Sequence, residues 1–103
     1  MRNNEAQARP LVNPTVNLNG STAQSLVDDI IKVINSLRDA EKAMAWATPH
    51  GRDYKDFDDW RLARDAWHDR RNAVAAMMSE LEEYAYAIAM QDTRKINTKE
   101  SNL

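Results

Sequence analysis

The sequence predicts an all-α protein, a long antiparallel two-helix hairpin with helices at about residues 21–48 and 57–92. Two long segments carry apolar residues in steps of three and four, the spacing that places them in one stripe along one side of a helix. The residues "PHG" at 49–51 have the composition of a turn and separate the two segments. At 103 residues the chain is one domain at most, so helix contacts or self-association are expected to supply its stability.

An irregular N-terminal arm is predicted over residues 1–20, because its prolines interrupt any helical period. Three apolar side chains in this arm can dock it on the helices, either in its own chain or in a second protomer: Val12, Val16 and Leu18. Ser21 and Gln24 have the spacing of a capping box, in which the hydroxyl and the amide satisfy free N–H groups at a helix start. The first helix is therefore predicted to begin at residue 21 or 22.

The first helix is predicted to carry a continuous apolar stripe. Its members are Leu26, Ile30, Val33, Leu37, Ala40, Met44 and Ala47. Val27, Ile31 and Ile34 widen this face beyond what one partner helix covers, and Val27 and Ile31 are predicted to contact a second protomer. The helix is expected to end at about Ala47 or Thr48, since a residue that precedes proline is disfavoured in the helical conformation.

The second helix is predicted to begin within "DFDD", where Asp56 or Asp58 can cap it. Its stripe is Trp60, Ala63, Trp67, Arg70, Val74, Met77, Leu81, Tyr84 and Ile88. No proline or glycine follows residue 51, so the helix is expected to reach about residue 92. The polar residues 93–103 are predicted to form a flexible tail.

An antiparallel arrangement about a 48–57 loop places Met44 near Trp60 and Leu26 near Met77. The longer second helix then extends beyond the first, so three large side chains near its end lack a partner there: Leu81, Tyr84 and Ile88. Either the arm or a second protomer must cover them. We therefore predict a homo-oligomer with these residues in its interface.

The connector "ATPHGRDYKDFDD" at residues 47–59 is longer and richer in polar and aromatic residues than a helix-to-helix turn requires. One interpretation makes it a binding site formed by His50, Arg52, Asp53 and Tyr54. In this interpretation Gly51 lets the backbone approach a ligand, Arg52 pairs with a phosphate or carboxylate, and Tyr54 stacks.

The other interpretation makes the connector purely structural. In this interpretation Asp53 caps a helix end. Tyr54 and Phe57 close the end of the core, and Arg52 pairs with a carboxylate. Arg70 is also open to two interpretations, because it is the one cation on the second stripe. It is either an interface arginine paired with a carboxylate such as Asp29, or a cation that faces a ligand.

Composition argues against several function classes. The 14 Lys and Arg are balanced by 16 Asp and Glu, for a net charge of -2, so no field attracts nucleic acid. Cysteine is absent, and no nucleophile-and-base pair or phosphate loop is recognisable, so we expect neither an enzyme nor a cofactor. Asp65 and His68 share a helix face, but the facing helix offers too few carboxylates for a metal site.

The N-terminus has no apolar leader, and no segment is apolar enough to span a membrane. A cytoplasmic location without membrane contact is therefore expected.

The segments "VNLNGSTAQSL" and, about thirty residues later, "PHGRDY" resemble a group of small helical proteins encoded by tailed bacteriophages. The resemblance covers about residues 16–90 and implies a phage accessory protein in the cytoplasm of an infected host, without implying an activity. The asparagine-rich arm and "KDFDDW" depart from the pattern, so any implied role is limited to Pro49–Tyr54.

These observations lead to three functional hypotheses. The first is a non-enzymatic protein that binds a host or phage macromolecule and inhibits a host defence system. The second is an oligomeric binder of a small anionic ligand such as a signalling nucleotide. The third is a structural or assembly factor of the virion.

Overall fold

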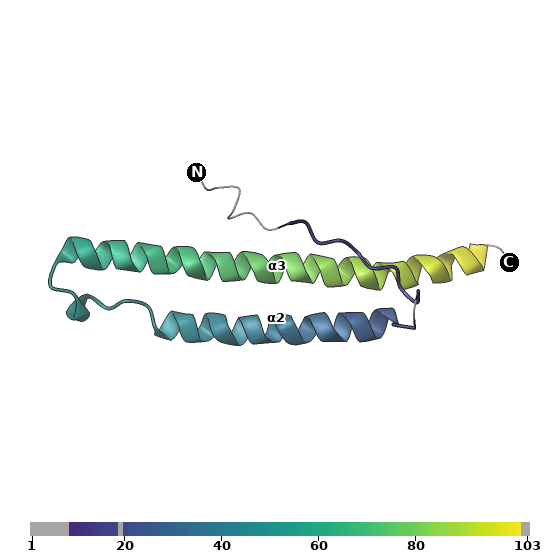
Figure 1. The fold of residues 1–103 in the computed structure, drawn as a ribbon, viewed down its shortest axis with the longest axis horizontal. Coiled ribbons are helices and arrows are strands. Elements are labelled where there is room, and N and C mark those ends of the chain that lie inside the picture. Colours follow the sequence, from purple (N-terminus) through teal and green to yellow (C-terminus); the bar gives the residue numbers. More distant parts are fainter. Residues whose placement is uncertain (1–8, 19, 102–103) are drawn as a thin grey trace.

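The computed structural model describes residues 9–18 and 20–101, and for residues 92–101 it describes the backbone alone. Helix α2 (Ala23–Trp46) and helix α3 (Phe57–Ser101) lie side by side and antiparallel (Figure 1). A connector that contains one short 3-10 helix, η1 (Gly51–Asp53), joins them. The described residues contain no strand, and the chain is elongated, with extents of 72 × 32 × 23 Å. The predicted all-α hairpin is confirmed.

Helix α2 begins at Ala23 because Thr22 caps it. The Thr22 hydroxyl accepts a hydrogen bond from the Ser25 backbone N–H at 3.0 Å, which satisfies one of the free donors of the first turn. The predicted capping box of Ser21 and Gln24 is wrong, because the Gln24 amide donates to the Asp28 carboxylate at 2.7 Å instead. The helix ends at Trp46, before the proline, as expected.

Helix α3 begins at Phe57 with Asp56 as its cap. The Asp56 carboxylate accepts from the Asp58 backbone N–H at 3.0 Å, and its carbonyl accepts from the Trp60 N–H at 3.1 Å. The predicted end at residue 92 is wrong, because the helical backbone continues to Ser101. The physical reason is that polar residues do not by themselves end a helix, and no proline or glycine lies in this stretch. Residues 1–8 of the predicted arm and residues 102–103 of the predicted tail lie outside the described residues.

The predicted register of the two helices is wrong by about two turns. Met44 was expected opposite Trp60, but its carbonyl accepts the indole N–H of Trp67 at 2.7 Å. Trp60 donates instead to the carbonyl of Pro49 in the connector, at 3.1 Å. The connector therefore runs beside the first turns of α3 rather than simply turning at its end (Figure 1).

This shift moves α2 toward the C-terminal part of α3. Ile88 is 1% exposed and Ala85 is buried, both within one chain. The start of α2 also reaches this region, since Ala23 and Ala89 line one hollow. The premise that the Leu81–Ile88 region lacks cover from its own chain is therefore wrong, and Ile88 is a core residue rather than an interface residue.

The arm docks on α3 of its own chain. The Gln91 side chain accepts from the Val16 N–H at 3.1 Å and donates to the Pro14 carbonyl at 2.8 Å. The Tyr84 hydroxyl donates to the Val12 carbonyl at 3.3 Å. Gly20 then turns the chain into α2 with a φ of 96°, which glycine adopts at little cost. These contacts assign the arm to its own chain and place Tyr84 beneath it.

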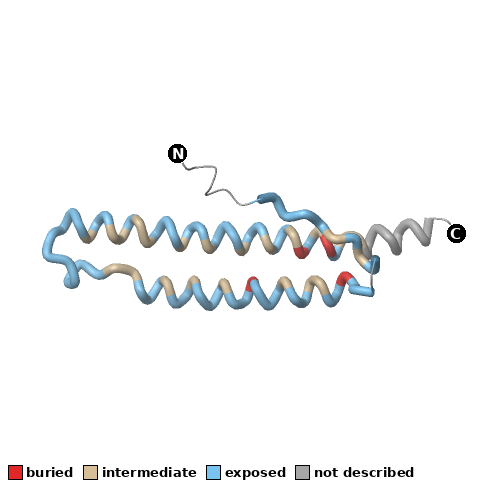
Figure 2. Tube along the Cα trace, in the orientation of Figure 1, coloured by how far each residue is buried: buried red, intermediate tan, exposed pale blue. Residues whose placement is uncertain are grey.

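Half of the predicted stripe residues on each helix face inward. At each of the other stripe positions, the residue that follows the predicted one faces inward instead. Ile34 is 5% exposed whereas Val33 is 49% exposed, and on α3 Met78 is more buried than Met77. The two possible phases of a three-four repeat share every other residue, such as Trp60 and Trp67, so the pattern alone does not separate them. Few residues become fully buried in this thin structure (Figure 2). Among the described residues they are Ala23, Ile34, Ala85 and Ile88.

Candidate functional site

The connector is ordered by its own hydrogen bonds. His50 caps η1, and its Nδ1 atom accepts from the Arg52 backbone N–H at 3.2 Å. The His50 carbonyl accepts from the Asp53 N–H at 3.0 Å, and the Gly51 carbonyl accepts from the Tyr54 N–H at 3.1 Å. One nitrogen of His50 is therefore committed to the turn, while Arg52 projects from it.

Trp60 is the platform on which the connector rests. Its indole N–H holds the Pro49 carbonyl, and the Arg64 guanidinium lies 4.8 Å from the ring centroid, within cation–π range. A Cβ atom at Gly51 would lie 3.9 Å from the Trp60 ring, an ordinary contact. Gly51 thus lies against Trp60, and neither its conformation nor its surroundings require glycine. This placement gives no support to the expectation that Gly51 admits a ligand.

An open groove of about 600 Å³ lies where the connector meets the helices. Of the predicted site residues, His50, Asp53 and Tyr54 meet at this groove. The other lining residues are Ala47, Thr48, Pro49, Ala63 and Trp67, which the predicted site did not include. Tyr54 is 37% exposed, so its ring lines the groove without closing a core.

Arg52 lies outside the lining of this groove and is exposed. Its guanidinium forms no ion pair with a carboxylate among the described residues, and Asp56 is engaged in capping α3. The alternative in which Arg52 pairs with a neighbouring carboxylate is therefore not what the structure shows. No lysine or arginine lines the groove, whereas Asp53 does, so the groove is poorly suited to an anion.

Arg70 is not brought to the connector. It is exposed, and its guanidinium donates to the Ala66 carbonyl of its own helix at 3.1 Å. The predicted partner Asp29 lies within 3.7 Å of Lys32 instead. The expectation of a core-facing Arg70 is wrong, because the inward position belongs to its neighbour Arg71.

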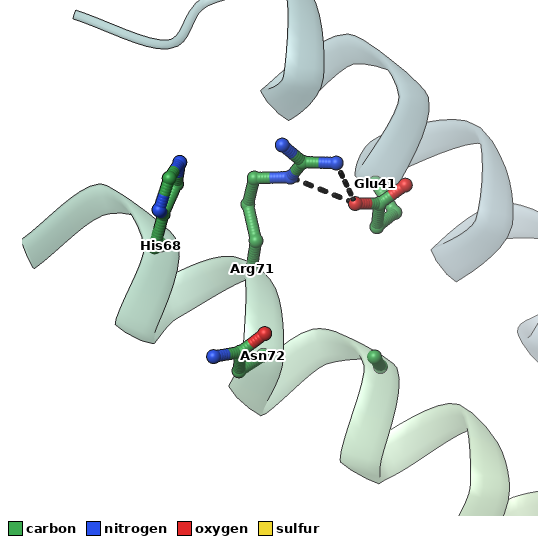
Figure 3. Close-up of a pocket in the computed structure, with 5 residues that line it drawn as sticks. Glu41, His68, Arg71 and Asn72 are labelled. Carbon is green, nitrogen blue, oxygen red and sulfur yellow. Dashed lines mark hydrogen bonds and ion pairs between the residues drawn. The ribbon is translucent and has the colours of Figure 1, made fainter. Parts of the chain in front are cut away.

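A second polar site joins α2 and α3 in the last turns of α2 (Figure 3). Arg71 reaches from α3 to Glu41 on α2, with Nη2–Oε2 and Nε–Oε2 distances of 2.6 and 2.8 Å. Both side chains are largely buried, with 29% and 25% exposed. His68 and Asn72 flank Arg71 on α3 and help line a groove of about 310 Å³.

The sequence analysis did not predict this pair. Glu41 follows the stripe residue Ala40, and Arg71 follows the stripe residue Arg70, so neither belongs to a predicted stripe. Its geometry suits structure more than chemistry, since Arg71 already neutralises the one carboxylate that lines the groove. Asp65 does not join His68, because it accepts from the Arg64 guanidinium at 3.2 Å. Within the described residues no group of three or more His, Asp or Glu is placed to hold a metal ion.

Comparison of this chain with protein-family models, with curated proteins and with solved structures finds no match. Over the part of the chain that is described, neither α2 nor α3 contains an apolar run able to cross a lipid bilayer.

Proposed function

We propose that this protein is a non-enzymatic phage accessory protein that binds a host or phage macromolecule through its connector, in the cytoplasm of an infected bacterium. One observation carries the proposal. The connector is ordered by its own backbone and by Trp60, yet it leaves the Arg52 guanidinium unpaired with any described carboxylate. Arginine and tyrosine are enriched at protein–protein interfaces, and here both are exposed, two residues apart, on an ordered backbone turn.

The chemistry of the groove favours a protein partner over a small anionic ligand. Asp53 lines the groove and no lysine or arginine does, so a phosphate placed there meets a like charge. The resemblance of Pro49–Tyr54 to the connector of phage-encoded helical proteins supports a role in infection. Inhibition of a host defence system is the biological role that we propose for this contact.

The proposal is tested by capturing partners of the tagged protein from infected cells and comparing two arginine variants. Arg52→Ala removes the unpaired connector cation, and Arg38→Ala removes an exposed arginine near the middle of α2 that pairs with Glu82 at 3.6 Å. The loss of one charge-assisted contact is expected to weaken partner binding by about tenfold to a hundredfold in Arg52→Ala. Arg38→Ala should bind as the wild type does.

Thermal melting separates a binding defect from a folding defect. Because the Arg52 side chain is exposed and forms no ion pair, Arg52→Ala should change the free energy of unfolding by no more than about 0.5 kcal/mol. A partner retained at full affinity by Arg52→Ala would overturn the proposal. A nucleotide that raises the melting temperature of the wild type, but not of Arg52→Ala, would instead support the anionic-ligand hypothesis.

A further inference from the structure

The hairpin exposes more surface than a compact protein of its mass. Its accessible area is 8181 Å², whereas a compact chain of 11.8 kDa exposes about 5,900 Å². Its radius of gyration is 20.0 Å, against about 13 Å for a compact domain of this length. A single hairpin with so small a core gains little from burial, so a partner that covers one face would add substantially to its stability.

The two flanks of the hairpin differ in character. On one flank the helices are joined by the Arg38–Glu82 ion pair at 3.6 Å and by the Glu41–Arg71 groove that contains His68. This polar flank satisfies its charges within the chain. Charged and polar side chains separate the apolar ones on this flank, such as Ile31, which is 43% exposed.

The opposite flank is apolar along most of its length. Ala47 on α2 and Ala63 on α3 line one groove and so mark the same side of the hairpin. Residues seven apart in such a helix share a flank, which extends this side along both helices. We name the resulting set the apolar flank: Leu26, Val33, Ala40 and Ala47 on α2, with Ala63, Arg70, Met77 and Tyr84 on α3. Val33 and Met77 are each 49% exposed on it.

The described part of the arm covers one end of this flank and no more. It bonds to Tyr84 and to Gln91, seven residues further along the same row. Residues 1–8 contain one large apolar side chain, Met1, and so have little apolar surface with which to cover the rest. A second copy, by contrast, presents a flank of the same length and the same apolar character.

We infer that a second copy of this chain packs on the apolar flank to form a four-helix bundle. Between Leu26 and Ala47 the flank is about 30 Å long, and two helices side by side are about 20 Å wide. Pairing therefore buries about 600 Å² on each copy, or about 1,200 Å² in total, which reaches the range of specific interfaces. Arg70, the charged member of the flank, donates to the Ala66 carbonyl of its own helix at 3.1 Å. The inference does not rest on the proposed function, although Ala47 and Ala63 belong both to this flank and to the connector groove.

The mass in solution tests the inference with two matched variants. Val33 and Ile31 are β-branched, belong to α2 and are 49% and 43% exposed, but Ile31 shares the polar flank with Arg38, seven residues away. The wild type at tens of micromolar should have twice the 11.8 kDa mass by light scattering behind a sizing column. Val33→Glu should lower the association constant by at least about a hundredfold, because pairing would bury an unpaired carboxylate. Ile31→Glu should remain a dimer.

A monomeric wild type would overturn the inference, as would equal dissociation by Ile31→Glu and Val33→Glu. Circular dichroism shows whether each variant keeps its helices. If Val33→Glu fails to fold, thiol protection provides the test, because the chain has no native cysteine. A thiol in Met77→Cys should react more slowly as protein concentration rises, and one in Ala75→Cys, on the polar flank, should not. Equal, concentration-independent rates at both positions would overturn the inference.

Discussion

The arm end and the connector end of the hairpin are held together by different interactions. At the arm end Ala23, Ala85 and Ile88 are buried, and the arm adds hydrogen bonds to Tyr84 and Gln91 (Figure 2). At the connector end most residues are exposed, and two indole N–H groups on α3 hold the backbone of the preceding segments. Apolar burial at one end and directional hydrogen bonds at the other allow the connector to stay ordered while its side chains remain accessible.

This difference agrees with the binding role proposed for the connector. A surface that binds another molecule needs exposed side chains with little internal pairing, and such a surface contributes little to folding stability. The connector end has this character at Arg52 and Tyr54. The arm end supplies the stability that the connector end lacks, so the two ends can be altered separately.

The largest expected effect is at the arm end. Ile88→Ala removes the most buried side chain and leaves a cavity, so we expect it to lower the free energy of unfolding by about 2–5 kcal/mol in urea denaturation. Tyr86→Ala is the control, because Tyr86 lies two residues away and is 67% exposed. This substitution should change the free energy of unfolding by about 0.5 kcal/mol or less. Similar losses in both variants would contradict a core at this end.

A smaller effect is expected where the arm docks. Gln91→Ala removes two hydrogen bonds, to the Val16 N–H and the Pro14 carbonyl, and should lower the free energy of unfolding by about 1–3 kcal/mol. Faster amide exchange over residues 12–18 should accompany the loss. Gln24→Ala removes one exposed bond to Asp28 and should leave exchange in the arm unchanged. Unchanged exchange in Gln91→Ala would show that other contacts hold the arm.

The smallest effect is expected at the connector. His50→Ala removes the acceptor of the Arg52 N–H and should cost about 0.5–1 kcal/mol, comparable with the loss of a weak helix cap. Amide exchange should accelerate over residues 51–54 and remain unchanged at the arm end. His50→Asn keeps a side-chain acceptor near the same backbone group and should restore most of the protection. A loss as large as that of Ile88→Ala would remove the contrast between the two ends.

The sequence predicted the connector residues better than their roles. His50, Asp53 and Tyr54 meet at one groove as expected, because they lie within five positions of a short turn and local spacing keeps them close. The support beneath them was not predictable, since the stripe predicts that Trp60 faces α2. The Trp60 indole N–H instead finds the Pro49 carbonyl of the connector, which folds back along α3, whereas Trp67 faces α2 and donates to Met44.

Features that depend on neighbouring residues follow from the sequence alone. The apolar periodicity, the break before Pro49 and the cap at Asp56 act within one or two turns, so the two helices and their connector follow from the local chain. The exception is the end of α3, where polar composition predicts a stop near residue 92 but no proline or glycine breaks the helix before Ser101.

The phase and the register of the helices depend instead on contacts between distant segments. Each three-four repeat has two phases that share every other position, and they differ by exchanging one residue for its neighbour, such as Val33 for Ile34. The choice depends on contacts made across the hairpin. Glu41 and Arg71 become suitable inward residues only when each neutralises the other, and the Trp67–Met44 hydrogen bond forms only in this register. Such pairwise energies belong to two distant segments at once, so no single stretch of sequence contains them.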